Sequence, residues 1–140
     1  MARRFWIGVA CAVHVQAGLA NGICAFSHGK HEAVARLKAG DRFIYYATKE
    51  RFENGASTGN PVQAFIASGT VTDFEPRKGT IANGPSWVKD ATYDAPFHVP
   101  AKSLLEELSF VTSPRHWGMA FRRSLFEVSQ ADFDLILTRA

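Results

Sequence analysis

The sequence has few cysteines and no uninterrupted apolar run long enough to cross a membrane. Its two cysteines, Cys11 and Cys24, are fewer than a small secreted disulfide scaffold usually carries, which favours a reduced, intracellular chain. Residues 5–26 are the most apolar stretch, but a histidine, a glutamine, an asparagine and three glycines interrupt it, whereas a spanning helix needs about 20 mostly apolar residues. No clean apolar run follows Arg3-Arg4, so a signal peptide is not expected. We therefore expect a soluble, cytoplasmic protein with no membrane partner.

The sequence also lacks the motifs that mark several enzyme classes. It contains no phosphate-binding P-loop, no dinucleotide-binding fingerprint and no nucleophile elbow. Its five histidines never approach zinc-site spacing with the cysteines; Cys11 and His14 are three residues apart, but nothing supplies the other ligands. We expect no catalytic residues, no metal ion and no cofactor.

Charge of either sign is present without a strong excess. The chain has 16 Lys and Arg against 13 Asp and Glu, a formal charge of +3, and no basic tail. Such a charge permits nucleic acid binding without showing it. Aromatic side chains, in contrast, are plentiful, with 11 Phe, 3 Trp and 3 Tyr. We therefore expect the main recognition feature to be a pocket rather than a flat basic surface.

The length of 140 residues suits one domain spanning residues 1–140. Apolar periodicity and turn residues predict strands at residues 5–10, 23–27, 42–46, 63–74, 93–99 and 119–128. Helical segments are predicted at residues 12–19, 33–37 and 103–108, and a last helix is predicted to follow Ser129 with Phe133, Ile136 and Leu137 on its buried face. Because strands and helices do not alternate regularly, the pattern indicates an α+β fold with a curved mixed sheet flanked by short helices.

Local signals mark two of the helices and two loops. Ser103 and Glu106 have the spacing of a capping box, and Ser129 with Asp132 marks the start of the last helix. The segments 50–61 and 75–86 are rich in glycine and proline, so we expect them to be mobile loops.

Ser27-His28-Gly29-Lys30 is the most informative short segment, because it follows a predicted buried strand abruptly. A glycine there allows close approach of a ligand, and exposed backbone N–H groups can bind the edge of a base. Lys30 carries a charge suited to a phosphate. An ordinary surface turn with a solvated lysine explains the same four residues, and on local grounds it is the commoner case.

Trp6, Tyr45, Tyr46, Trp117 and Phe121 are candidate rings for stacking on a base. Such stacking contributes roughly 1–3 kcal/mol per base, although core packing is the commoner role for any single ring. Tyr45 and Tyr46 are neighbours on one predicted strand, so we expect one ring to face the core or a pocket and the other to face away.

Basic residues near Trp117 are candidates for contact with a phosphodiester backbone. Arg115 and His116 precede Trp117, and Arg122-Arg123 follow it closely. If these side chains share one face they suit a nucleic acid strand. If they only form a solvated edge, they carry no function.

The order of short motifs along the chain closely resembles that of bacterial EVE domain proteins. The matching segments are Phe5-Trp6-Ile7-Gly8-Val9, His14-Val15, Ser27-His28-Gly29-Lys30, Ala35-Arg36-Leu37, Gly40-Asp41, Ile44-Tyr45-Tyr46, Gln63-Ala64-Phe65, Leu104-Leu105, Leu108-Ser109-Phe110, Trp117-Gly118, Phe126-Glu127-Val128-Ser129 and Asp132-Phe133. Each segment is short, so the specificity comes from their order over essentially the whole chain. The resemblance implies a PUA-like fold, similar to that of YTH domains, which hold N6-methyladenine in an aromatic cage.

The resemblance also implies a function. EVE domains look like readers of modified nucleobases in DNA or RNA, modified cytosine among them, and the implied partner protein is a nuclease or restriction component. Relatives usually carry a serine where this chain has Cys11, a weaker hydrogen-bond donor. Carried over to this chain, the implied ligand-binding residues are Trp6, Cys11, Ser27, His28, Gly29, Lys30, Tyr45, Tyr46, Thr48, Trp117, Phe121 and Arg122, with Trp117 and the loop at residues 27–30 around one pocket.

Two other classes of function stay open at this point. Some PUA-like relatives of the ASCH type resemble small amidohydrolases that act on acylated nucleosides with a Lys, a Thr and a Glu, for which Lys30, Thr48 and Glu50 are the candidates here. A lysine active in this way needs burial or a cationic neighbour to lower its pKa. A protein-interaction adaptor has no sequence feature in its favour.

Overall fold

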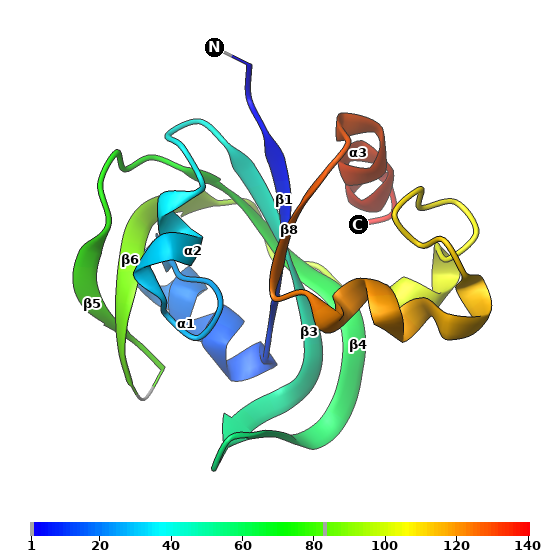
Figure 1. Ribbon diagram of the computed structural model, residues 1–140, viewed down its shortest axis with the longest axis horizontal. Coiled ribbons are helices and arrows are strands. Elements are labelled where there is room, and N and C mark those ends of the chain that lie inside the picture. Colours follow the sequence, from blue (N-terminus) through cyan, green and yellow to red (C-terminus); the bar gives the residue numbers. More distant parts are fainter. Residues whose placement is uncertain (1, 83) are drawn as a thin grey trace.

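A strongly curled mixed sheet forms the centre of the computed structural model, which describes residues 2–82 and 84–140 (Figure 1). Its strands are β1 (Phe5–Ala10), β2 (Ile23–Cys24), β3 (Arg42–Glu53), β4 (Ala56–Val71), β5 (Arg77–Ile81), β6 (Gly84–Tyr93), β7 (Val99–Pro100) and β8 (Leu125–Val128). The helices are α1 (Ala12–Asn21), α2 (His31–Ala35) and α3 (Gln130–Thr138), with 3₁₀ segments η1 (Ala101–Ser103) and η2 (Pro114–Arg122). No helix within the described residues is both long enough and apolar enough to cross a bilayer.

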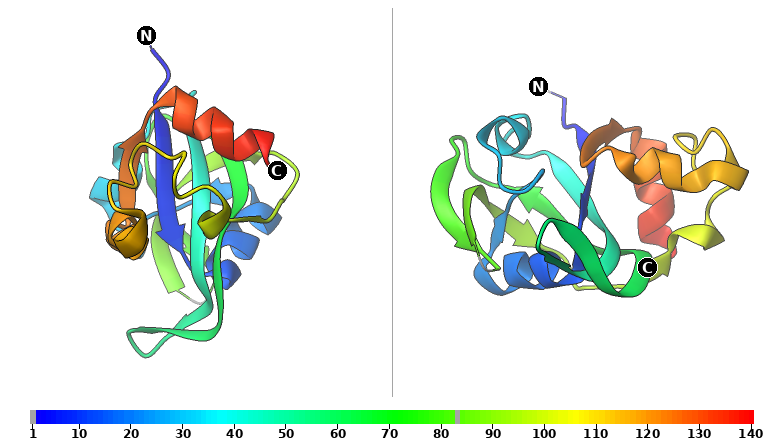
Figure 2. Two further views of the ribbon diagram at one scale, coloured as in Figure 1. Left: turned by 90° about the vertical axis from the view of Figure 1, so that its right-hand side faces the viewer. Right: turned by 60° about the horizontal axis from the view of Figure 1, so that its bottom comes forward.

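The strands follow the order β2-β6-β4-β3-β1-β8, with β5 paired to β6 and β7 paired to β4. β1 and β3 are parallel, whereas β1–β8, β3–β4 and β4–β6 are antiparallel. Helices α1 and α2 lie inside the curl of the sheet, and α3 and η2 cover its other side (Figures 1 and 2). This arrangement confirms the predicted α+β class with a curved mixed sheet and short helices.

The sheet carries a hydrophobic core on each of its faces. Tyr45 belongs to the core beneath α1 and α2, whereas Tyr46 belongs to the core beneath α3 and η2. Both rings are buried, with exposed fractions of 0% and 2%. The expectation that one of the two would face away from the core was wrong, because both faces of the sheet are covered and alternating side chains are therefore buried on either side.

Two segments predicted as loops are hairpin strands instead. Residues 50–61 belong to the β3–β4 hairpin, which turns at Asn54-Gly55 with both residues in the left-handed region. Residues 75–86 contain β5 and the start of β6. The prediction of loops was wrong because glycine and proline usually indicate loops. Here they occupy turns and β-bulges, and the pairing of β3 with β4 shifts register at several points.

The chain between β6 and β8 has less regular structure than the sequence predicts. The expected capping box does not form, since the hydroxyl of Ser103 donates to the carbonyl of Pro100 at 2.6 Å. Residues 94–98 form no strand, and residues 119–122 end η2 rather than begin one. Of the strand predicted at residues 119–128, only the last four residues form a strand, β8.

Two helix ends that carry capping signals are correct, in contrast to the one expected at Ser103. α1 ends at Asn21 and is capped by Gly22, whose φ of 64° is left-handed and whose N–H donates to the carbonyl of Gly18. α3 begins at Ser129, whose hydroxyl accepts from the N–H of Asp132 at 3.1 Å. Local capping chemistry thus predicts these ends without tertiary information.

A buried carboxylate connects the start of β1 to the turn before β3. Asp41 is only 3% exposed. One of its oxygens accepts from the N–H of Arg4 at 3.0 Å, and the other accepts from the indole N–H of Trp6 at 3.1 Å and the N–H of Lys38 at 2.9 Å. Hydrogen bonds to a charged group are stronger than those between neutral groups. Asp41 therefore holds the parallel strands β1 and β3 in register.

Replacing this carboxylate should lower the free energy of unfolding. In Asp41→Asn one oxygen becomes an amide nitrogen that faces an N–H donor, and we expect a loss of about 1.5–3 kcal/mol. Urea denaturation followed by circular dichroism measures it. Asp134→Asn, on the exposed side of α3, is the matched control and should change stability by less than about 0.5 kcal/mol. Equal stability of the two variants would contradict the assignment.

Candidate functional site

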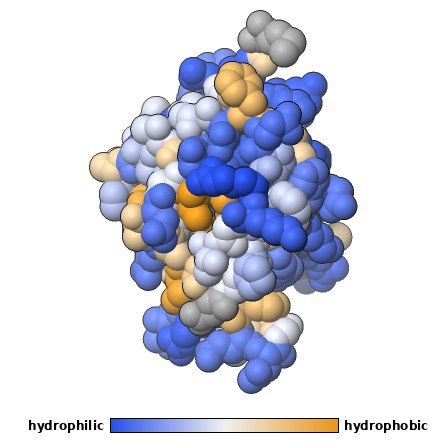
Figure 3. All heavy atoms as spheres, turned by 90° about the vertical axis from the view of Figure 1, so that its left-hand side faces the viewer, coloured by the Kyte–Doolittle hydropathy of each residue, from blue (hydrophilic) through white to orange (hydrophobic). Residues whose placement is uncertain are grey.

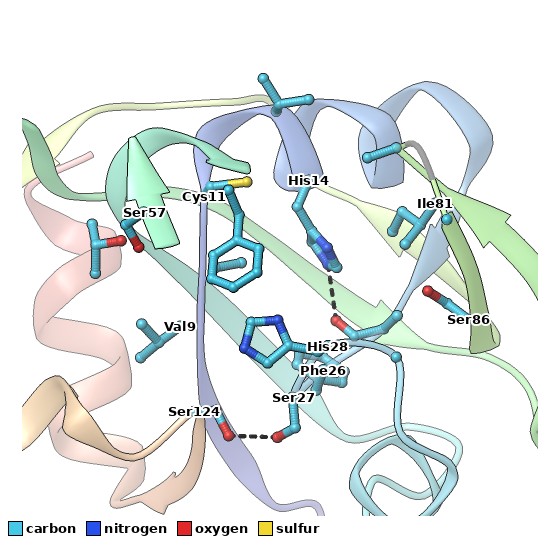
Figure 4. A pocket seen from close by; sticks show the side chains of 18 of the residues that line it. Val9, Cys11, His14, Phe26, Ser27, His28, Ser57, Ile81, Ser86 and Ser124 are labelled. Atoms are coloured by element: carbon cyan, nitrogen blue, oxygen red, sulfur yellow. Dashed lines mark hydrogen bonds between the residues drawn. The ribbon is translucent and has the colours of Figure 1, made fainter. Parts of the chain in front are cut away.

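A cavity of about 540 Å³ opens at the end of β1 (Figure 4). This volume lies within the usual range for small-molecule sites. Its walls come from the β1–α1 junction, the loop after β2, the β3–β4 hairpin, the turn between β5 and β6, and the segment that ends η2. On the side of the molecule that carries β5 and β6, apolar side chains reach the surface only in small patches among hydrophilic ones (Figure 3).

The loop after β2 has an unusual backbone. Residues 27–29 have φ angles of 52°, 60° and 77°, three left-handed conformations in succession. Left-handed backbone costs about 1–2 kcal/mol for each residue with a Cβ, and strain of this kind concentrates at functional sites. Neighbours hold the turn in place: the N–H of Gly29 donates to the carbonyl of Phe26 at 3.0 Å, and the N–H of Trp87 donates to the carbonyl of Gly29 at 2.9 Å.

Gly29 meets a second requirement besides its backbone angle. A Cβ at this position would lie 2.7 Å from the Cβ and 2.9 Å from the Cα of Ser86 on β6. Real Cβ atoms do not approach other atoms so closely. The turn therefore packs directly against β6, and glycine is required there for space as well as for conformation.

Aromatic rings line the cavity from several directions. Phe26 is buried and stacks on Tyr45 with centroids 5.3 Å apart. The rings of His28 and Phe52 are 4.7 Å apart and bridge the loop and the β3–β4 hairpin, and Phe52 is 45% exposed. Phe121, at the end of η2, also lines the cavity. A flat ligand entering here meets rings carried by separate elements.

His14 contributes a neutral imidazole to the cavity wall. Its Nε2 lies 3.1 Å from the carbonyl oxygen of Ala25 (Figure 4). Because a carbonyl only accepts, the proton resides on Nε2 and Nδ1 is left as an acceptor. Burial lowers the pKa of His14 below its ordinary value of 6.5, the bond to Ala25 opposes this, and the nearby His28 lowers it further. The ring is therefore uncharged at neutral pH.

Most of the predicted ligand-binding residues lie together in this cavity. The lining includes Cys11, Ser27, His28, Gly29, Thr48, Phe121 and Arg122. The hydroxyls of Ser27 and Ser124 are 2.5 Å apart and join the loop to the segment after η2 (Figure 4). These residues come from distant parts of the sequence, and their assembly places polar and aromatic side chains around one space.

The other five predicted residues do not line the cavity, and four of them lie in the core or on the surface. Trp6 is a core residue that donates to Asp41, and Tyr45 and Tyr46 fill the two cores of the sheet. Lys30 is exposed at the start of α2 and does not line the cavity. Tyr45 supports the wall indirectly, because its hydroxyl donates to the carbonyl of Ala25 at 2.8 Å.

Trp117 lines a different space from the loop at residues 27–29. It borders a second hollow of about 290 Å³, whose lining includes His116, Met119 and Arg123. The expectation that Trp117 and the loop share one pocket was wrong. The 3₁₀ segment η2 continues past Trp117, so Phe121 at its end reaches the first cavity instead.

The sequence did not identify several lining residues as ligand-binding. Phe52 lies in a segment predicted as a loop, and only the long β3–β4 hairpin brings it to the cavity. His14 carries a usable signal, since it follows β1 at the start of a predicted helix and belongs to a segment that matches the family, although it is not among the predicted ligand-binding residues. Phe26, Ser86 and Ser124 carry no local signal, because their positions depend on which strands pair.

The residues proposed for amidohydrolase chemistry do not converge on the cavity. Of Lys30, Thr48 and Glu50, only Thr48 lines it. Glu50 accepts from the N–H of Asn60 at 2.7 Å within the β3–β4 hairpin. Within residues 2–82 and 84–140, no three His, Cys, Asp or Glu side chains gather as metal ligands.

Comparison with known proteins identifies relatives along the whole chain. The family model for the EVE domain matches residues 4–139. A UPF0310 protein from Renibacterium salmoninarum is 33% identical over 94% of this chain and 91% of its own length. The UPF0310 protein YdcG of Bacillus subtilis is 31% identical over 95% of this chain and 89% of its own length.

Solved structures share the fold at low sequence identity. A hypothetical protein from Leishmania major aligns with a TM-score of 0.60 at 12% identity, covering 99% of this chain and 94% of its own. The NMR structure of a protein from Rhodopseudomonas palustris aligns with a TM-score of 0.57 at 17% identity, covering 96% and 91%. These alignments extend the agreement from sequence to architecture.

The close approach at Gly29 should make this position intolerant of a side chain. Gly29→Ala incurs both left-handed strain and a clash with Ser86, whereas Gly55→Ala, at a φ of 78° with open space around it, incurs the strain alone. We expect Gly55→Ala to lower the free energy of unfolding by about 1–2 kcal/mol and Gly29→Ala to lower it by clearly more. Urea denaturation of both variants measures the difference, and similar losses would refute the close packing.

The lowered pKa of His14 should make the fold sensitive to mild acid. Below pH 6.5 the unfolded chain binds a proton at His14 more readily than the folded chain, so the free energy of unfolding falls as the pH decreases through that value. Urea denaturation at pH 7.5 and pH 5.5, about one unit either side of 6.5, should show this fall in the wild type and a smaller one in His14→Gln. His98→Gln, at an exposed histidine, should keep the wild-type fall; the same result for both variants would count against a buried neutral His14.

Proposed function

The chain belongs to the EVE domain family, and from that premise we propose that it is a nucleic-acid-binding module that holds one modified nucleobase in the cavity at the end of β1. The fold is the PUA-like curled sheet of that family. The proposal concerns recognition, and assigns no reaction to the chain.

The observation that carries this proposal is that aromatic rings and a left-handed backbone turn line the same cavity. The ring pair of His28 and Phe52 stands beside the left-handed turn at residues 27–29. A nucleobase has two flat faces, and each base stacked on an aromatic ring gains roughly 1–3 kcal/mol. It also has a polar edge, which the hydroxyls of Ser27, Thr48 and Ser86 and the acceptor nitrogen of His14 can meet.

The charges around the cavity favour a pocket over a polyanion surface. Arg51 lines the cavity, but it forms ion pairs with Glu53 at 3.2 Å and with Glu50 at 3.9 Å. Arg122 also lines the cavity, and it has no carboxylate partner within the described residues. With so few free cations, affinity would come from the enclosed base more than from many phosphate contacts.

The size of the cavity bears on the form of the nucleic acid. A space of about 540 Å³ suits one base and its sugar, so the base must be unpaired or turned out of a duplex. Because only Thr48 of the candidate hydrolytic residues lines the cavity, we assign any cleavage that follows recognition to a partner, for which a nuclease or restriction component is our proposal. Turnover of an acylated nucleoside by the isolated chain would favour the hydrolase alternative instead.

The test is a binding screen combined with a matched pair of phenylalanine variants. Single-stranded oligonucleotides carrying 5-methylcytosine, 5-hydroxymethylcytosine or N6-methyladenine are titrated beside unmodified ones, and at least one modified strand should bind more tightly. Phe52→Ala should then weaken its binding by about 5- to 150-fold, the equivalent of one lost stacking contact. Phe74→Ala, at a phenylalanine that is 81% exposed and outside the cavity, should leave binding unchanged.

Thermal melts provide the control for folding. Phe52 is 45% exposed, so its removal should shift the melting temperature little. If the wild type binds modified and unmodified strands equally, or if Phe52→Ala binds as well as Phe74→Ala, the proposed function is wrong.

A further inference from the structure

We propose that the second hollow, beside Trp117, holds the nucleotide adjacent to the modified base, so that the chain recognises a strand rather than a single nucleoside. This inference rests on the proposed function of the first cavity. It commits the second hollow to one occupant, a neighbouring nucleotide of the same strand.

The end of η2 separates the two spaces. Met119 and Ala120 line the second hollow, Phe121 and Arg122 line the first cavity, and Arg123 lines the second hollow again. Five successive residues span at most about 14 Å even when fully extended. The two spaces are therefore close neighbours, on the scale of adjacent nucleotides in one strand.

Phe121 connects the two spaces physically. Its ring lines the first cavity and makes an edge contact with Trp117, with centroids 6.0 Å apart and ring planes at 76°. Phe121 is also stacked on Tyr46, with centroids 3.9 Å apart, so its position is held by the core. A base in the first cavity and a base beside Trp117 would lie on either side of one fixed ring.

Trp117 has the properties of a stacking surface rather than of a core residue. It is partly exposed and packs only against the edge of the core, whereas Trp6 is buried and its indole N–H donates to Asp41. The indole N–H of Trp117 has no hydrogen-bond acceptor among the described residues. Met119 beside it is 59% exposed, so a base stacked on Trp117 would also cover this apolar side chain.

The charges at the boundary suit a phosphate between the two bases. Arg122 and Arg123 are exposed, one toward each space, and the guanidinium of Arg123 lies 4.2 Å from the ring centroid of Phe126. Neither arginine, nor Arg115 at the start of η2, takes part in an ion pair within residues 2–82 and 84–140. No Asp or Glu lines the second hollow. A strand crossing this boundary would place its linking phosphate beside unpaired cations.

The experiment compares a nucleoside with a strand. 5-Methyldeoxycytidine, 5-hydroxymethyldeoxycytidine and N6-methyladenosine are each titrated as the free nucleoside and as the centre of a single-stranded pentanucleotide. For the modification that binds, we expect the wild type to hold the pentanucleotide about 5- to 150-fold more tightly than the nucleoside, the gain of one further stacked base. Trp117→Ala should lose this gain and keep the wild-type affinity for the nucleoside, and Trp117→Phe should retain most of it.

A second variant tests the phosphate contact without touching an aromatic ring. Arg123→Gln should weaken the pentanucleotide alone and reduce the slope of log affinity against log salt by about 0.7, the value for one phosphate contact on a single strand. Because its side chain is exposed, this variant stays informative if Trp117→Ala fails to fold in a thermal melt.

The outcomes separate this inference from the function it rests on. If the wild type binds the nucleoside but gains nothing from the strand, or if Trp117→Ala weakens both ligands equally, the second subsite is disproved and the proposed function stands. If folded Trp117→Ala and Arg123→Gln both bind the pentanucleotide as tightly as the wild type, the second subsite is likewise disproved. The hollow would then bind something else, such as a partner protein. If the wild type binds neither ligand, both proposals fall.

Discussion

The left-handed turn at residues 27–29 is the constraint on which the cavity depends. Three successive left-handed residues are unfavourable by themselves, so the surrounding contacts must hold them. The absence of a side chain at Gly29 lets the turn press against Ser86 on β6, and the absence of one at Gly8 lets the ring of Phe26 lie against β1, where a Cβ would come within 2.6 Å of it. A glycine on β1 and a glycine in the turn after β2 thus leave the space in which the loop and its rings can assemble.

How far the sequence predicts this fold depends on how local each signal is. β1, α1 and α3 are predictable because periodicity and capping act within a few residues, as between Ser129 and Asp132. The β3–β4 hairpin is not, because its glycines and Pro61 suggest a loop until pairing with the opposite strand compensates for them. Long-range pairing is a tertiary effect that overrides local preference.

The same distinction applies to the site. The loop at residues 27–29 was recognisable because a glycine follows polar residues directly after a strand, and Phe121 and Arg122 were included as neighbours of Trp117. Which of these rings reaches which space depends on the phase of an irregular 3₁₀ segment with a non-helical residue at His116. A break in phase of that kind cannot be derived from periodicity. Because of this break, Trp117 lines the second hollow rather than the first cavity.

The modest net charge of the chain agrees with recognition in a pocket. A surface that binds a nucleic acid through its phosphates needs many unpaired cations and binds with steep salt dependence. Here Arg51 is neutralised by Glu53, and the neutral His14 adds an acceptor rather than a charge. Arg122 and Arg123, which form no ion pair in the part of the chain that the structure describes, lie where a strand bound as proposed would cross η2. Under the proposed function, these arginines would orient one strand, and the shape and hydrogen-bonding groups of the cavity would decide which base is accepted.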